Sequence, residues 1–133
     1  MRVILDTNII ISAALFPNGR TAQAFNKALV PPYQPIVCDY VIDELQRKFR
    51  EKFPQRTTEL ESFLFKALAH IKLVSTPEDE LEVEAKIRDQ KDRPILRAAL
   101  NAHADLFLTG NKDFLELSVT DPRIISVPEF LDM

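Results

Sequence analysis

Short apolar runs rich in branched side chains recur along the chain, and the segments between them carry apolar residues at helical spacing. Each run has the length and composition of a strand that is buried on both faces of a sheet. The five runs are residues 3–5, 36–38, 71–74, 106–108 and 124–127. Strands that alternate with helices predict an α/β fold with a mainly parallel, five-stranded sheet.

The segments expected to be helical are amphipathic and are bounded by prolines. Apolar residues three or four positions apart mark one helix through Val41, Leu45 and Phe49, and further helices over residues 60–68 and 95–100. The expected breaks are the turn Pro17-Asn18-Gly19, the pair Pro31-Pro32 and the step Phe53-Pro54. Residues 76–92 are strongly charged, which predicts an exposed connection with a helix around residues 81–87.

Composition places the chain among globular proteins of ordinary domain size. With 133 residues, of which 46% are apolar and 28% charged, we expect one domain over residues 1–133. The single cysteine, Cys38, excludes an intramolecular disulfide and a zinc site built on several thiolates, and we expect it to pack in the core. No stretch approaches the ~20 apolar residues that cross a bilayer, so we expect a cytoplasmic protein without a membrane segment.

Net charge excludes a general attraction to nucleic acid. Lys and Arg total 17 and Asp and Glu total 20, which gives a net charge of −3. A protein of this charge has no overall basic field that would draw it onto RNA or DNA. Any chemistry on nucleic acid must therefore depend on a local site.

Acidic side chains follow the predicted strands. Asp6 comes directly after the first strand, and Asn111 and Asp113 follow the strand at 106–108. In an open parallel sheet, ligands bind outside the carboxyl ends of the strands. Glu44, at the front of the helix after the second strand, and Asp92, before Pro94 in a first helical turn, are expected at the same edge.

Each acid also has a plain structural explanation. Asp6, Asp92 and Asp113 are all placed where an Asp caps a helix N-terminus, which stabilises it by ~0.5–2 kcal/mol. Glu44 alone is most simply a solvated helix residue. Capping does not explain why three of the four fall at one edge of the sheet, so the set favours a shared site.

A cluster of carboxylates requires compensation. Two of them ~4 Å apart repel by ~4 kcal/mol at an effective dielectric constant near 20, so the site must bind protons or a cation. Oxygen ligands without paired His or Cys suit Mg²⁺ or Mn²⁺. Such ions hydrolyse phosphodiesters, which would let a protein of net charge −3 act on RNA.

Four segments of the chain resemble, in order and spacing, the motifs of PIN-domain proteins. They read VILDTN at 3–8, EL at 44–45, DQKDRPILRAA at 89–99 and TGNKDFL at 109–115. The similarity spans almost the whole chain and is greatest to small single-domain PIN proteins related to the VapC-type toxins of toxin–antitoxin systems.

That resemblance implies a three-layer α/β/α fold and a metal-dependent endoribonuclease that cleaves single-stranded RNA with a metal-activated water. It implies Asp6, Glu44, Asp92 and Asp113 as the catalytic, metal-binding acids, with Mg²⁺ or Mn²⁺ as the cofactor. The supporting polar positions it implies are Thr7, Asn8, Thr109 and Asn111. An antitoxin protein and a second copy of the chain, in a homodimer, are the expected partners.

One position departs from many relatives, which carry Asp where this chain has Asn111. The loss of that charge is expected to weaken a second metal site, which predicts one strong and one weak ion. Asn also occurs at this position in relatives, so it does not indicate inactivation.

Basic residues near the acids are candidates for contact with RNA phosphates. Arg93, Arg97 and Lys112 lie close to the predicted site in sequence. Residues 46–52 form the densest basic patch, for which a solvated helix face is the simpler interpretation.

Two other functions remain open at this point. The chain is a catalytically weak PIN scaffold that binds RNA or a protein, or a phosphoacceptor receiver domain. The receiver domain ranks low because it needs an Asp at the end of the third strand, where this chain has Ser75 and Thr76.

Overall fold

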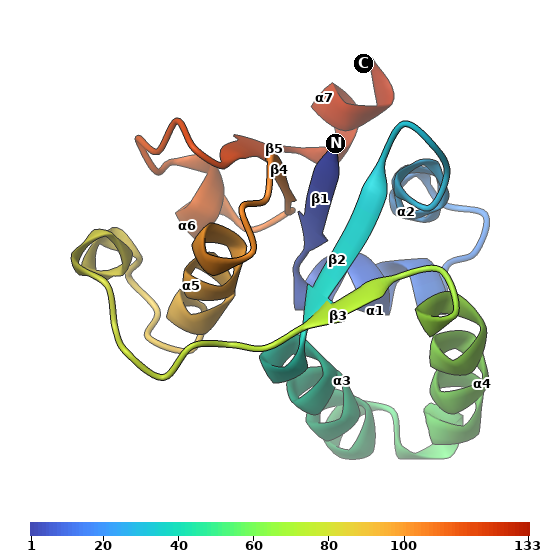
Figure 1. The fold of residues 1–133 in the computed structure, drawn as a ribbon. Helices are drawn as coiled ribbons and strands as arrows, with labels where there is room; N and C mark the ends of the chain where they lie inside the picture. The colour runs from blue at the N-terminus through green and yellow to red at the C-terminus, as the bar shows by residue number, and fades with distance from the viewer.

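A five-stranded sheet forms the centre of the computed structural model, which describes all of residues 1–133 (Figure 1). The strands are β1 (Arg2–Leu5), β2 (Gln34–Cys38), β3 (Lys72–Val74), β4 (Leu106–Leu108) and β5 (Arg123–Ile125). Their order across the sheet is β3-β2-β1-β4-β5, and every neighbouring pair is parallel. The predicted parallel sheet is therefore confirmed, with β1 at its centre.

Helices cover both faces of this sheet. They are α1 (Thr7–Leu15), α2 (Arg20–Ala28), α3 (Asp39–Lys52), α4 (Thr57–Leu68), α5 (Arg93–Asn101), α6 (Lys112–Leu115) and α7 (Val127–Leu131), with short 3₁₀ turns η1 (Pro54–Arg56) and η2 (Glu82–Lys86). Figure 1 shows α5 and α6 on one side of the sheet and α1, α2 and α4 on the other, which gives three layers. None of the helices is both long and apolar enough to cross a membrane.

The core sits around the central strands. Val3, Ile4 and Leu5 of β1 are completely buried, because helices pack on both sides of this strand. Such burial explains why the strands read as continuous apolar runs without alternation. Cys38 is buried and unpaired, as its expected packing role requires.

The predicted end of the last strand was wrong. The last strand ends at Ile125 and not at residue 127, because the Ser126 hydroxyl accepts from the backbone N–H of Glu129 and starts α7. This capping box ends the strand two residues earlier than the apolar run suggests.

The charged connection over residues 76–92 is also less exposed than expected. The predicted helix is the 3₁₀ turn η2, and Glu84 and Ile87 are buried within the connection. Glu84 accepts two hydrogen bonds from the Arg97 guanidinium of α5, at 2.6 and 3.0 Å. This ion pair lets a carboxylate leave solvent and holds the connection against α5.

Candidate functional site

A small pocket opens where β1 and β4 end. Three of the four predicted acids line it, each from a different part of the chain: Asp6 after β1, Glu44 from α3, and Asp92 before α5. The remaining lining residues are Thr7, Asn8, Lys48, Ile95, Asn111 and Phe114. The order of the strands places β1 beside both β2 and β4, and the segments that follow these three strands therefore meet at one edge.

Asp6 is the most deeply placed of the acids and is only 3% exposed. One carboxylate oxygen caps α1 by accepting from the backbone N–H of Ile9 at 3.0 Å, and the other accepts from the Thr109 hydroxyl. Burial raises the pKa of Asp6 to about 6, and the negative charge of Asp92 adds to the effect. Asp6 therefore both caps α1 and lines the pocket.

Glu44 faces the pocket and not solvent. Its side chain is 5% exposed, because it lies on the face of α3 that carries Val41 and Leu45 into the core. The Thr7 hydroxyl donates to Oε1, and the Arg47 guanidinium lies 3.7 Å from Oε2. The simpler interpretation of Glu44 as a solvated helix residue was therefore wrong.

Asp92 lies half-buried at the start of α5, where Pro94 occupies the first turn as expected. It makes no capping bond with its side chain, and instead Oδ2 accepts from Nδ2 of Asn111 at 3.0 Å. The pKa of Asp92 is raised, first by burial and then by the negative charges of Asp89 and Glu44.

The polar segment between β4 and α6 connects these carboxylates. Thr109 is fully buried, donates its hydroxyl to Asp6 and accepts the backbone N–H of Asn111 at 3.0 Å. Thr7, Thr109 and Asn111, predicted as supporting positions, thus each donate to one of the three acids. Asn8 lines the pocket with its side chain largely exposed.

Asp113 is the acid that the structure does not bring into the pocket. Its carboxylate pairs with the guanidinium of Arg88 at 2.8 Å, at the edge of the site. It does not cap α6 either, because the Asn111 side chain takes that position and accepts the backbone N–H of Asp113 at 3.0 Å. The expected convergence of four acids is therefore a convergence of three, with Asp113 held by a basic residue that sequence analysis did not select.

The residues expected to contact phosphates have different surroundings. Arg97 is buried against Glu84 and donates to the Pro77 carbonyl at 2.8 Å. Because its donors are engaged in these bonds, the prediction that Arg97 contacts a phosphate was wrong. Arg93 donates from Nε to the Ile87 carbonyl at 3.0 Å. Lys112 is exposed at the start of α6.

The chemistry of the pocket fits a hard divalent cation. Its donors are carboxylate, amide and hydroxyl oxygens without Cys or His, the set that Mg²⁺ and Mn²⁺ prefer. The pKa values of Asp6 and Asp92 are raised chiefly by burial and further by neighbouring carboxylates, so the ionised forms of both acids are unfavourable there. As the side chains stand, each carboxylate is hydrogen-bonded to a neighbour, and no three of the acids are grouped closely enough to share one ion.

Sequence analysis missed Lys48 as a residue of the site. It lies four residues after Glu44 on α3 and lines the same pocket, because residues i and i+4 share a helix face. That spacing was the signal by which it could have been found.

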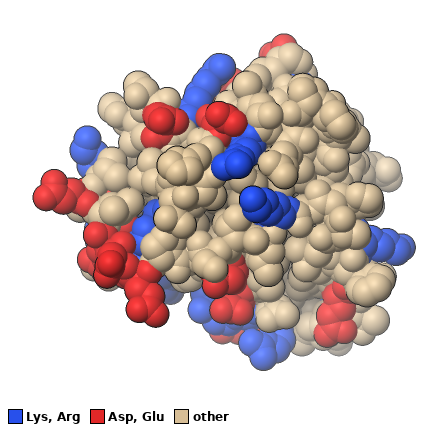
Figure 2. All heavy atoms as spheres, in the orientation of Figure 1, with Lys and Arg blue, Asp and Glu red and all other residues tan.

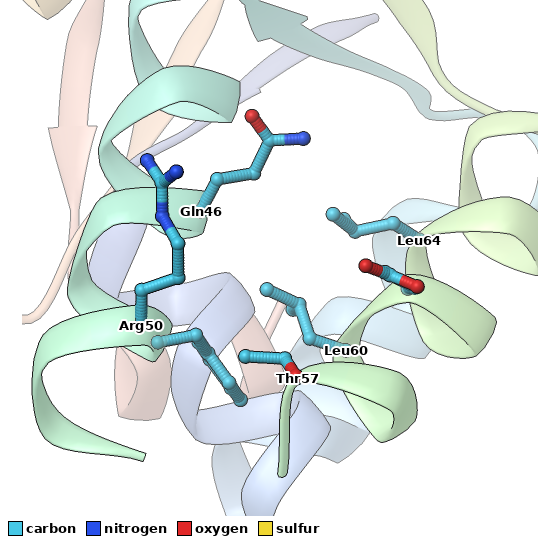
Figure 3. Close-up of a pocket in the computed structure, with 7 residues that line it drawn as sticks. Gln46, Arg50, Thr57, Leu60 and Leu64 are labelled. Carbon is cyan, nitrogen blue, oxygen red and sulfur yellow. The ribbon is translucent and has the colours of Figure 1, made fainter. Parts of the chain in front are cut away.

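A larger hollow of about 330 Å³ lies between α3 and α4. Figure 3 shows Gln46 and Arg50 of α3 on one side of it and Thr57, Leu60 and Leu64 of α4 on the other. Phe49 and Glu61 complete the lining. It is apolar at its base and contains none of the predicted acids.

Comparison with known proteins places the chain in a family. A model described as PIN domain matches residues 2–113. The crystal structure of VapBC2 from Rickettsia felis, bound to a DNA fragment from their promoter, contains a chain of the same fold, with a TM-score of 0.72 and 15% identity over 95% of this chain and 98% of that one. A domain of a functionally unknown protein from Methanocaldococcus jannaschii matches with a TM-score of 0.58 and 17% identity over 94% and 89% of the two chains.

No curated protein matches the sequence significantly. The family match nevertheless extends from β1 to the start of α6 and includes all four predicted acids. Because this match is to the PIN domain, the alternative of a phosphoacceptor receiver domain was wrong. The parallel sheet, the pocket at its carboxyl edge and this match together establish that the chain belongs to the PIN domain family.

Proposed function

We propose that the protein is a metal-dependent endoribonuclease that hydrolyses phosphodiester bonds of single-stranded RNA in the cytoplasm, and that it is the toxin of a toxin–antitoxin pair. The observation that carries the proposal is the pocket shared by Asp6, Glu44 and Asp92 in a PIN domain. Three carboxylates from distant parts of the chain meet in this pocket, and a bound cation would offset the repulsion between their ionised forms.

The three acids would hold Mg²⁺ or Mn²⁺, with Asp113 available at the rim once it leaves Arg88. A bound ion of this kind neutralises charge on the phosphodiester and lowers the pKa of the attacking water. Thr7 and Thr109 orient the carboxylates of Glu44 and Asp6 through their hydroxyls. Asn111 holds Asp92 with a neutral amide, which supports one strong and one weak ion.

An antitoxin partner is the second part of the proposal. One solved structure of this fold is VapBC2 bound to promoter DNA. The hollow between α3 and α4, with Phe49, Leu60 and Leu64 in its lining, offers apolar surface for a protein segment. Expression of the chain with the product of an adjacent small gene tests this part: a stable complex without cleavage activity is expected, and continued cleavage in its presence would contradict it.

Cleavage of labelled single-stranded RNA tests the nuclease. Purified protein is incubated with Mn²⁺, Mg²⁺ or EDTA beside two variants, Asp6→Asn in the pocket and Asp43→Asn, an exposed carboxylate next to Glu44 on α3. Cleavage that needs metal, is lost in Asp6→Asn and persists in Asp43→Asn supports the proposal. Absence of metal binding by calorimetry would overturn it, and binding without cleavage of any RNA would favour the PIN scaffold that binds RNA or a protein.

A further inference from the structure

A second hollow adjoins the acid pocket on its α3 side. It measures about 290 Å³ and lies between α3 and the turn that precedes α5. Glu44, Lys48 and Asp92 line both this hollow and the acid pocket, so the two are continuous. We call it the α3 groove, and its lining consists of Glu44, Arg47, Lys48, Glu51, Lys52, Asp89, Lys91 and Asp92.

The basic side chains of the α3 groove are free to bind an anion. Among them only Arg47 has an ionic partner, Glu44 at 3.7 Å, while Lys48, Lys52 and Lys91 form no ion pair in the structure. Arg47, Lys52 and Lys91 are exposed, and Lys48 is half-buried at the point where the groove meets the pocket. Four cations from both walls therefore face one channel.

The ionised side chains that line the α3 groove balance one another in number. Four basic and four acidic residues line it, but Glu44 and Asp92 belong equally to the pocket. Once a cation compensates those two, Glu51 and Asp89 remain against four positive charges. The groove then differs in sign from the molecule as a whole, whose net charge is −3.

Acidic side chains gather elsewhere on the surface. Figure 2 shows the main group of acidic residues on the left, over the connection between β3 and α5, and a mixture of basic and acidic residues at the lower end, where Figure 1 places α3. The two walls of the groove are also tied together, because the Tyr40 hydroxyl of α3 donates to the carbonyl of Lys91. This hydrogen bond holds the two walls of the α3 groove at a fixed separation.

We infer that the α3 groove binds the phosphates of single-stranded RNA and leads one of them to the acids. This inference rests on the proposed nuclease function and names how that site takes its substrate. The groove has no aromatic or other apolar lining on which bases would stack. Its contacts are therefore with the backbone, independent of base sequence and strongly dependent on salt.

The first test measures binding of a fluorescein-labelled, mixed-sequence RNA by anisotropy at several salt concentrations. All proteins keep the wild-type acids of the pocket, and Ca²⁺, which takes the same oxygen ligands, replaces Mg²⁺ so that a cation is available while hydrolysis is suppressed. The groove variant carries Arg47→Gln, Lys48→Gln and Lys52→Gln. The matched control variant carries Arg20→Gln, Lys66→Gln and Lys72→Gln, which are exposed basic residues outside the groove. Circular dichroism and thermal melts confirm that both fold.

The groove variant is expected to bind RNA at least tenfold more weakly at ~50 mM salt. The slope of log K against log salt concentration should also be shallower by about 2, because each lost phosphate contact on a single strand changes this slope by ~0.7. The control should stay within about twofold of the parent. Equal losses in both variants would mean a diffuse charge effect, and no loss in the groove variant would mean that RNA lies elsewhere. Either result overturns the inference.

A gain of binding provides a test that misfolding cannot imitate. Glu51→Gln removes an unpaired acid from the groove and should strengthen RNA binding severalfold, whereas Glu82→Gln, exposed on η2, should not. Unchanged or weaker binding by Glu51→Gln contradicts the inference.

Cleavage assays distinguish a failure of the groove inference from a failure of the proposed nuclease function. RNA bound through the groove but never cleaved supports the groove and defeats the proposed catalysis. RNA cleaved with the same KM by the wild type and by a protein carrying only the three groove substitutions defeats the groove and leaves the nuclease standing.

Discussion

Asn111 donates a hydrogen bond from Nδ2 to Oδ2 of Asp92 across 3.0 Å, and so joins the start of α6 to the start of α5. Through its backbone N–H the same residue is bonded to Thr109, whose hydroxyl donates to Asp6. The carboxylates of Asp6 and Asp92, whose negative charges repel each other, are therefore both held by this short polar segment. A neutral amide at position 111 makes this arrangement possible without a cation.

Asn111→Asp should make the metal-free protein less stable and its response to metal larger. The change replaces a donor with a second carboxylate about 3 Å from Asp92, which loses a hydrogen bond and adds repulsion, with a cost of roughly 1–3 kcal/mol. Thermal melts at pH 7 in EDTA and in Mn²⁺ measure both effects. A lower melting temperature in EDTA with a larger rise on addition of Mn²⁺ is expected, and identical melts would contradict the hydrogen-bonded role of Asn111.

Ionisation of Asp6 should lower the free energy of unfolding of the metal-free protein as pH rises. Its pKa is raised from 3.8 to about 6 by burial, so the folded state binds the proton more tightly than the unfolded chain does. Stability from this group is present below pH 4 and is lost as pH rises to about 6 and above, by up to about 3 kcal/mol. Asp6→Asn lacks this loss.

Urea denaturation of the wild type and Asp6→Asn in EDTA, at pH 4.5 and pH 7, checks the prediction. The difference between the two proteins cancels other groups, such as Glu84, whose lowered pKa acts in the opposite direction. The variant should gain on the wild type as pH rises. If the variant were less stable than the wild type by the same amount at both pH values, burial would not disfavour the ionised form of the Asp6 carboxylate.

The parallel sheet and three of the acids could be predicted because both depend on local sequence. Strands buried on two faces have to be apolar throughout, so a polar residue such as Asp6 directly after the run marks the strand's end. The carboxyl ends of parallel strands then share an edge, which brings Asp6, Glu44 and Asp92 together.

Pairs between distant charged residues could not be predicted in this way. Arg97 was expected near phosphate, but it is hydrogen-bonded to the Glu84 carboxylate, 13 residues away in sequence. Asp113 is 25 residues from Arg88. Spacing along the chain does not reveal which of several nearby charges a long side chain will meet, because the path of the intervening connection decides it.

Arg97→Gln should destabilise the fold by roughly 3–5 kcal/mol, because it leaves the buried Glu84 carboxylate without its partner. The double variant Arg97→Gln and Glu84→Gln should lose less than the sum of the two single changes. Urea denaturation of the four proteins measures this coupling. Arg56→Gln is the matched control, since the ion pair that it breaks with Glu59 lies at the surface, where solvent screens it, and its loss should leave stability almost unchanged. Additive losses would mean that the pair does not anchor the connection.

Arg88→Gln should tighten metal binding while leaving stability almost unchanged. The Arg88 side chain is 84% exposed, and solvent screens an ion pair of such a residue, so its loss costs the fold little. In the wild type, however, an ion that recruits Asp113 must first separate it from a guanidinium 2.8 Å away. Calorimetric titration with Mn²⁺ should therefore show a severalfold lower Kd for Arg88→Gln than for Arg123→Gln, an exposed arginine on β5. If Arg88→Gln bound Mn²⁺ no better than this control, Asp113 would not be a ligand, and the site would rest on Asp6, Glu44 and Asp92 alone.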